Sequence, residues 1–135
     1  MDLSEDEIQK ILTTSKTIAV VGLSSKPDRP SHEIASYLKD QGYRIIPVNP
    51  TIQEALGEKA YPSLRDVPGR IDIVQIFRRP EEVPAIVDDA ISIGAKVVWM
   101  QPGAENEEAA AKAESAGLKA VVGACMRSVH RTLRV

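Results

Sequence analysis

The stretch Thr17-Ile18-Ala19-Val20-Val21-Gly22 decides the fold, because it is a short run of apolar, mostly β-branched residues that ends in glycine. Such a run is typical of a strand that is buried on both faces, as the strands of parallel sheets are. The preceding segment, residues 4–14, predicts a short helix, since Ser4 and Glu7 have the spacing of a capping box and apolar residues then recur on one stripe.

Strand-like and helix-like segments alternate after this first strand. Parallel strands joined by helices form βαβ units with right-handed crossovers, so we expect one domain over residues 1–135 with a doubly wound, mainly parallel, five-stranded α/β sheet and helices on both faces. The further strands are expected at 43–48, 71–77, 96–100 and 118–122, and the further helices at 31–41, 80–93, 105–116 and 125–133. Between them, residues 51–70 lack a clear pattern, and we expect helical turns near Ile52–Leu56 and Ser63–Asp66.

Composition excludes several functions. The net charge is −2, which does not suit the broad basic surface that nucleic acids require. One cysteine, Cys125, and two histidines, His32 and His130, exclude an internal disulfide and make a metal centre unexpected. We expect a cytoplasmic protein, because the acidic N-terminus differs from a secretory signal and no apolar run approaches the ~20 residues of a membrane span.

The loop after the first strand carries the main chemical signal, in Gly22-Leu23-Ser24-Ser25-Lys26 and in Arg29. Glycine lets the backbone approach a ligand closely, the next residues offer amide and hydroxyl groups, and the two cations favour an anion. A helix that starts near Ser31 adds its dipole, so the segment predicts a phosphate or diphosphate site. The alternative is an ordinary connection in which the serines cap the helix and the cations are solvated.

Known nucleotide motifs are absent from this loop. It has neither the Gly-Lys-Ser/Thr of a P-loop nor the Gly-x-Gly-x-x-Gly of dinucleotide-binding proteins. The second strand ends in Val48-Asn49-Pro50, where an NAD-binding protein usually has an acidic residue for the ribose. Both features disfavour NAD.

The residues nevertheless resemble a known family, the CoA-binding domain proteins related to the Rossmann-like CoA-binding domain of the succinyl-CoA synthetase α subunit. The resemblance extends from about Lys16 to Cys125 as an ordered set of short stretches. They are Val21-Gly22-Leu23-Ser24-Ser25, Arg29-Pro30-Ser31, Gly42-Tyr43-Arg44-Ile45-Ile46-Pro47-Val48-Asn49-Pro50, Phe77-Arg78-Arg79-Pro80 and Gly94-Ala95-Lys96-Val97-Val98-Trp99-Met100-Gln101.

The resemblance implies a coenzyme A site along the strand ends. It places the CoA diphosphate at residues 22–25, the adenosine against Val48-Asn49-Pro50 and Phe77-Arg78-Arg79-Pro80, and the pantetheine towards Trp99-Met100-Gln101. Lys26, Arg29 and the two arginines are candidate partners for the phosphates. This sequence departs from many relatives at Thr51 and Ile52, which replace a basic residue, and at Pro102.

We therefore expect a module that binds CoA or an acyl-CoA without catalysis of its own, and name no catalytic or metal-binding residue. One alternative is a component of an acyl-CoA ligase or transferase that acts only with a protein partner, which the sequence does not identify. An NAD(P)-binding redox protein ranks below both. Replacing Gly22 by a β-branched residue is expected to weaken CoA binding and leave the fold intact.

Other reactive side chains have plainer interpretations. Cys125 is expected to be a half-buried structural thiol, and the alternative is a mixed disulfide with the CoA thiol. His32 is expected to be solvated beside the phosphate loop, and His130 to lie on the surface near the C-terminus. Trp99 is expected in the core, and the glutamates at 105, 107 and 108 favour a helix N-terminus through its dipole.

Overall fold

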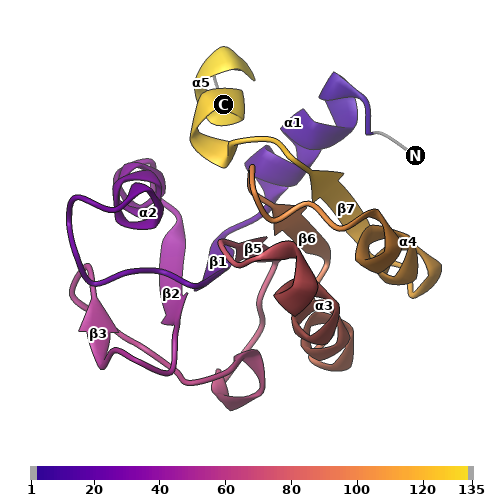
Figure 1. Ribbon diagram of the computed structural model, residues 1–135. Helices are drawn as coiled ribbons and strands as arrows, with labels where there is room; N and C mark the ends of the chain where they lie inside the picture. The colour runs from indigo at the N-terminus through magenta and orange to yellow at the C-terminus, as the bar shows by residue number, and fades with distance from the viewer. Residues whose placement is uncertain (1–2, 134–135) are drawn as a thin grey trace.

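A computed structural model describes residues 3–133, whose centre is a five-stranded sheet with the order β2-β1-β5-β6-β7. Every neighbouring pair of these strands runs parallel. The expected doubly wound α/β class is confirmed, with β1 placed between β2 and β5 (Figure 1). The strands are β1 (Thr17–Val21), β2 (Arg44–Val48), β5 (Ile73–Ile76), β6 (Val97–Met100) and β7 (Lys119–Val122).

Helices cover both faces of the sheet, as expected (Figure 1). One face packs against α1 (Glu5–Thr14), α2 (Pro30–Asp40) and α5 (Met126–Leu133). The other packs against α3 (Val83–Ser92) and α4 (Glu107–Ser115). Each face therefore has its own hydrophobic core, and the strands between the two cores are buried on both sides.

The residues of strand β1 contribute alternately to the two hydrophobic cores. Ile18 and Val20 belong to the core under α1, α2 and α5, whereas Ala19 and Val21 belong to the core under α3 and α4. This alternation follows from the period of two in a strand, and it explains why the run is apolar throughout. Trp99 is fully buried on β6, as expected, and its indole Nε1 donates to the Ala124 carbonyl at 2.7 Å.

Most element boundaries lie close to the expected ones. Helix α1 starts after Ser4, whose hydroxyl accepts from the Glu7 amide while the Glu7 carboxylate accepts from the Ser4 amide, so the capping box is confirmed. The expected helix 80–93 is divided into a 3-10 turn, η2 (Pro80–Glu82), and α3. The division places Glu82 at the point where the two meet.

The segment 51–70 contains one correction. Instead of a helical turn near Ile52–Leu56, a hairpin joins β3 (Glu54–Ala55) to β4 (Glu58–Lys59). Leu56 and Gly57 both have positive φ, 54° and 74°, as a tight type I′ hairpin turn requires. The second expected turn is confirmed as η1 (Leu64–Asp66).

His130 is also not where the sequence indicates. It is only 4% exposed, so the expectation of a surface residue is wrong. Its Nδ1 lies 2.8 Å from the hydroxyl of Tyr37, and its ring meets those of Tyr37 and Tyr43 edge to face. Helix α5 turns this side chain inward against α2, and burial lowers the pKa of His130.

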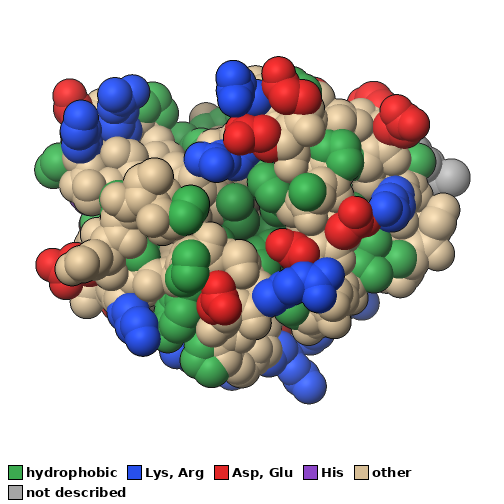
Figure 2. Space-filling model, turned by 60° about the horizontal axis from the view of Figure 1, so that its bottom comes forward, with side chains coloured by type: hydrophobic (Ala, Val, Ile, Leu, Met, Phe, Trp, Pro, Cys, Tyr) green, Lys and Arg blue, Asp and Glu red, His purple; other side chains and the backbone are tan. Residues whose placement is uncertain are grey.

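The face of the molecule in Figure 2 carries basic and acidic side chains side by side, with hydrophobic side chains between them.

Within residues 3–133, no helix is long and apolar enough to cross a membrane. The same residues contain no group of three or more His, Cys, Asp or Glu side chains that could hold a metal ion.

Candidate functional site

A large open cleft lies at the carboxyl ends of the strands and has a volume of about 990 Å³. Ligands of doubly wound sheets bind at this edge, beside the point where successive connections leave in opposite directions. Here that point is β1, because the chain leaves it towards β2 and later returns to its other side as β5. The cleft is lined by Gly22, Ser24, Ser25, Lys26, Arg29, Pro30, Ser31, Asn49, Thr51, Ile52, Phe77, Arg78, Arg79, Glu82, Pro102, Gly103 and Ala104.

Gly22 is the point at which three of the lining segments meet. Its amide donates to the Val48 carbonyl at 2.9 Å, and its φ of 91° lies in the region that favours glycine. A Cβ atom here would lie 2.5 Å from the Phe77 carbonyl oxygen and 3.0 Å from Arg78 Cδ. The glycine is therefore required by the protein's own backbone, and a β-branched residue at 22 would disturb the fold, contrary to the sequence-based expectation.

The loop after Gly22 is held by hydroxyl groups from within the loop. The Ser24 amide donates to Ser31 Oγ at 3.0 Å, and the Lys26 amide donates to Ser24 Oγ at 3.1 Å. Within residues 3–133, the amides of Ser25 and Ser31 donate to no protein acceptor, although both residues line the cleft. Unpaired backbone N–H groups at a concave loop attract anions.

Helix α2 begins at this loop. Arg29 is its N-cap residue and makes no side-chain capping bond, while Pro30 occupies the first turn. The positive end of the helix dipole thus opens into the cleft together with the exposed Lys26 and Arg29. His32 lies in the same turn but outside the cleft lining.

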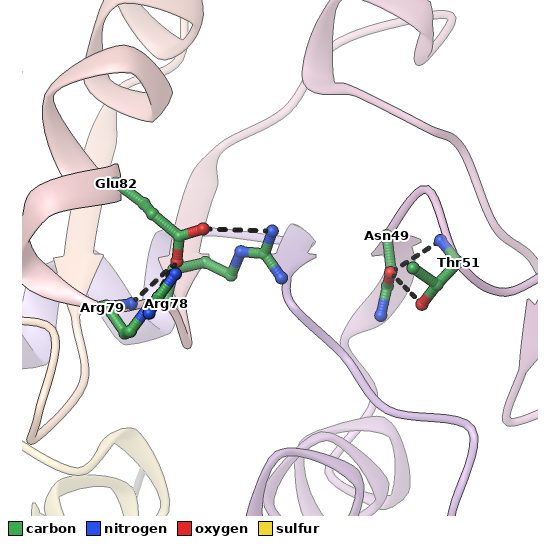
Figure 3. Close-up of polar contacts among 5 residues, drawn as sticks. All are labelled: Asn49, Thr51, Arg78, Arg79 and Glu82. Carbon is green, nitrogen blue, oxygen red and sulfur yellow. Dashed lines mark hydrogen bonds and ion pairs between the residues drawn. The ribbon is translucent and has the colours of Figure 1, made fainter.

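Asn49 connects the end of β2 to the phosphate-loop candidate, the loop of residues 22–31. It is 9% exposed, and its Nδ2 donates to the Leu23 carbonyl at 3.0 Å. Its Oδ1 accepts from the Thr51 amide at 2.9 Å and from the Thr51 hydroxyl at 2.7 Å (Figure 3). With these bonds made, Asn49 acts as a positioning residue that fixes Leu23, whose own side chain is fully buried.

Arg78 and Arg79 follow β5 and share one carboxylate, that of Glu82. Arg78 Nη2 lies 3.5 Å from Glu82 Oε1, and Arg79 Nε lies 3.7 Å from Glu82 Oε2. Figure 3 shows the Arg78 guanidinium beside Glu82, on the side that faces Asn49 and Thr51. Arg78 Cδ lies close to Gly22, 3.0 Å from the position that a Cβ of that residue would have, and the side chain lines the same cleft as the loop after Gly22.

Met100 and Gln101 are buried and do not line the cleft. Gln101 Oε1 accepts from Gln75 Nε2 at 3.1 Å and from the Met126 amide at 2.8 Å, so it joins two strands to the start of α5. The next residues, Pro102 to Ala104, line the cleft in their place. At this end of the sheet the cleft lining begins at Pro102, directly after the stretch that the resemblance indicates.

Cys125 is half-buried at the start of α5 and packs against the core under α1, α2 and α5. Burial raises the pKa of its thiol, but hydrogen bonds from Ser128, Gln101 and Arg127 outweigh it and hold the pKa below its ordinary value. The sulfur is outside the cleft lining. Its packing agrees with a structural thiol, and a reaction with the CoA thiol stays a hypothesis.

Comparison with protein families decides the identity of this fold. Residues 16–131 match the family model described as a CoA binding domain, which is most of the chain. The chain belongs to the CoA binding domain family. The match includes the cleft and all five strands of the sheet.

Relatives of this CoA binding domain are of two sizes. The uncharacterized protein YneT of Bacillus subtilis is 47% identical over 127 residues, which are 94% of each chain. A solved hypothetical protein from Pyrococcus horikoshii superposes with a TM-score of 0.95 at 44% identity, covering 98% of this chain and 94% of that one. The ADP-forming acetate–CoA ligase II of Archaeoglobus fulgidus is 32% identical over 73% of this chain, which spans only 15% of the ligase.

The CoA binding domain brings most of the predicted site residues together. The cleft is lined by Gly22, Ser24, Ser25, Lys26, Arg29, Asn49, Phe77, Arg78 and Arg79 from that set. Val48 and Pro50 instead line an adjoining cavity of about 240 Å³ between β2, η1 and α3. Leu23, Met100 and Gln101 are buried outside both.

Sequence reasoning missed Glu82 as a cleft residue of this CoA binding domain. It lines both cavities, and so does Arg78. The available signal was the spacing of four between Arg78 and Glu82, which favours an ion pair on a helix.

Proposed function

We propose that this protein binds coenzyme A, with the diphosphate on loop 22–31 and the 3′-phosphate beside Arg78 or Arg79. The observation that carries the proposal is the pair of unpaired amides, of Ser25 and Ser31, in a cleft that also contains exposed cations. Membership of the CoA binding domain family supports the same ligand.

The residues present fit such a ligand chemically. Phosphate groups require N–H donors and positive charge, and Lys26, Arg29 and the two arginines supply the charge around the loop. The adjoining cavity is lined mainly by apolar groups, among them Val48, Pro50 and Leu64, which suit the flat face of a base. Residues of this chain thus provide one polar and one apolar region next to each other.

Binding without catalysis is the form of this function that the cleft supports. Its titratable side chains, within the described residues, are those of Lys26, Arg29, Arg78, Arg79 and Glu82. Three serines also line it, but among residues 3–133 none of them has a histidine as a hydrogen-bond partner. General acid–base or nucleophilic catalysis needs such a base within hydrogen-bond reach of the nucleophile.

A second candidate function rests on the similarity to ADP-forming acetate–CoA ligases. In that case the protein holds CoA for a partner that carries the catalytic groups. Ligase or transferase activity that depends on a second subunit would support this candidate, whereas CoA binding by the isolated chain is common to both.

Isothermal titration of the purified protein with CoA, dephospho-CoA and NAD tests the proposal. We expect saturable binding of CoA, weaker binding of dephospho-CoA if the 3′-phosphate is bound, and no competition by NAD. Lys26→Gln should weaken CoA binding, whereas Lys10→Gln removes the same charge from an exposed position on α1 and should not. Equal binding by both variants would contradict the assigned loop.

A further inference from the structure

The cleft contains a carboxylate among its cations. Glu82 is the acidic residue in a lining that otherwise offers Lys26, Arg29 and two arginines. A carboxylate repels a phosphate and competes with it for the same guanidinium groups. Its presence in a site for an anion therefore needs a reason.

Glu82 occupies the two arginines that the ligand phosphates would use. Its Oε1 lies 3.5 Å from Arg78 Nη2, and its Oε2 lies 3.7 Å from Arg79 Nε (Figure 3). Both arginines are partly exposed, at 36% and 76% of their side chains, and Glu82 is 33% exposed. A ligand therefore reaches the guanidinium groups from the open side without first opening the fold.

Arg78 lies close both to Glu82 and to the start of the loop at Gly22. Its Cδ lies 3.0 Å from the position that a Cβ would have at Gly22, so its stem passes close to the start of loop 22–31. The guanidinium contacts Glu82, and the Arg78 side chain lines the same cleft as the loop residues that would hold a phosphate. Movement towards a bound phosphate lengthens the contact with Glu82.

We propose that Glu82 is an internal competing anion that lowers the affinity of this cleft for phosphate-bearing ligands. The inference rests on the proposed function, because it concerns the same site. Without ligand, the single negative charge of Glu82 is shared by Arg78 and Arg79 and offsets part of their positive charge. With ligand, the phosphate replaces the carboxylate as a partner of Arg78, and the displaced charge still opposes binding. Affinity is thereby kept below what the cations alone would give.

Glu82 also has a structural contact that needs no charge. Its Oε2 accepts from the Arg79 amide at 3.2 Å, as the third residue of the η2 turn. A glutamine at this position of a capping box makes the same bond. Glu82→Gln therefore removes the competing charge and keeps the cap.

The neighbouring Glu81 provides the matched control. It lies in the same η2 turn, is exposed, does not line the cleft, and has no ion pair within residues 3–133. Glu81→Gln changes the net charge of the protein as much as Glu82→Gln does. A difference between the two variants thus reports the position of the charge and not its removal alone.

The experiment is calorimetric titration of the wild-type protein, Glu82→Gln and Glu81→Gln with CoA, and separately with inorganic pyrophosphate, at low ionic strength. We expect Glu82→Gln to bind CoA about two- to five-fold more tightly, the range of a partly exposed ion pair. Glu81→Gln should bind like the wild type. Urea unfolding of each variant checks that the fold is retained.

Other outcomes overturn the inference in distinguishable ways. Unchanged or weaker CoA binding by Glu82→Gln would show that the carboxylate positions Arg78 for the ligand. If the wild type does not bind CoA, the proposed function fails, and pyrophosphate then decides the role of Glu82: tighter binding by Glu82→Gln supports competition, and equal binding refutes it. If none of the three proteins binds either anion, both proposals fail.

Discussion

The substitution Gly22→Ala tests whether the close contact at the start of the cleft is as restrictive as the structure indicates. The geometry predicts two contributions to the destabilisation of Gly22→Ala. The φ of 91° is unfavourable for alanine by about 1–2 kcal/mol. In addition, the new Cβ would lie 2.5 Å from the Phe77 carbonyl oxygen, which is backbone and can yield only if the end of β5 moves.

The second cost is similar to that of overpacking, about 1–3 kcal/mol. The free energy of unfolding should therefore fall by about 2–5 kcal/mol, a large part of the 5–15 kcal/mol that is typical of natural proteins. Gly42→Ala is the matched control, because Gly42 has a similar φ of 102° but nothing within 4 Å of its added Cβ. Gly42→Ala should therefore lower the free energy of unfolding only by the cost of the positive φ, about 1–2 kcal/mol.

Urea unfolding followed by far-UV circular dichroism measures both variants at one pH and temperature. The expected difference between them, about 1–3 kcal/mol, isolates the contact with Phe77 and Arg78. Destabilisation of the two variants that agrees within about 0.5 kcal/mol would refute the steric argument. A folded Gly22→Ala protein should also bind CoA less tightly, since the loop must move away from its partner segment.

Two further predictions concern residues that hold the cleft and the sheet. Asn49→Ala leaves the buried Leu23 carbonyl without its side-chain donor, so unfolding by urea should become easier by about 1–3 kcal/mol and calorimetry should show weaker CoA binding. Burial raises the pKa of Asp72, but other contacts outweigh it and hold the pKa below its ordinary value. The amides of Lys16 and Thr17 donate to the carboxylate at 2.8 and 3.0 Å. The positive charges of Lys96 and Arg70 add to this effect. Since the carboxylate binds its proton less readily in the folded state, this stabilisation is present above the unfolded pKa, near 4, and is lost as the pH falls through the folded pKa. Urea unfolding at pH 7 and at pH 3 should show a smaller loss for Asp72→Asn than for the wild type, and an equal loss would contradict the assignment.

Local pattern was sufficient for the sheet and most helices. The run Thr17–Val21 is apolar on both faces because both faces are covered, and that signal is contained in the residues themselves. The hairpin at β3 and β4 was missed because its turn is Leu56-Gly57, in which leucine takes a positive φ that its type rarely adopts. His130 was placed wrongly because its burial depends on Tyr37, 93 residues away in the sequence.

The residues of the cleft were likewise predicted only where the local sequence determines their position. Residues of the loop at 22–29 were predicted because a strand, a glycine and a helix start follow one another directly. Whether a residue such as Gln101 faces the cleft or the core depends on how the chain leaves β6, and here its side-chain Oε1 accepts from the Met126 amide at the start of α5. The spacing of four between Arg78 and Glu82 indicated an ion pair, but the position of Glu82 in the cleft depends on the turn η2, which the local pattern did not separate from the helix.

The central position of β1 also has a consequence for the order in which the protein is assembled. Its edge towards β2 can be paired once residue 48 has been synthesised, but its other edge waits for β5, at residues 73–76. During that interval a nascent chain presents an apolar strand with one open edge, and such edges attract other strands. The cleft needs the ends of β1, β2 and β5 and also the segment after β6, so it forms only after this crossover is complete. CoA in the proposed pose would consequently stabilise only chains that have completed the crossover.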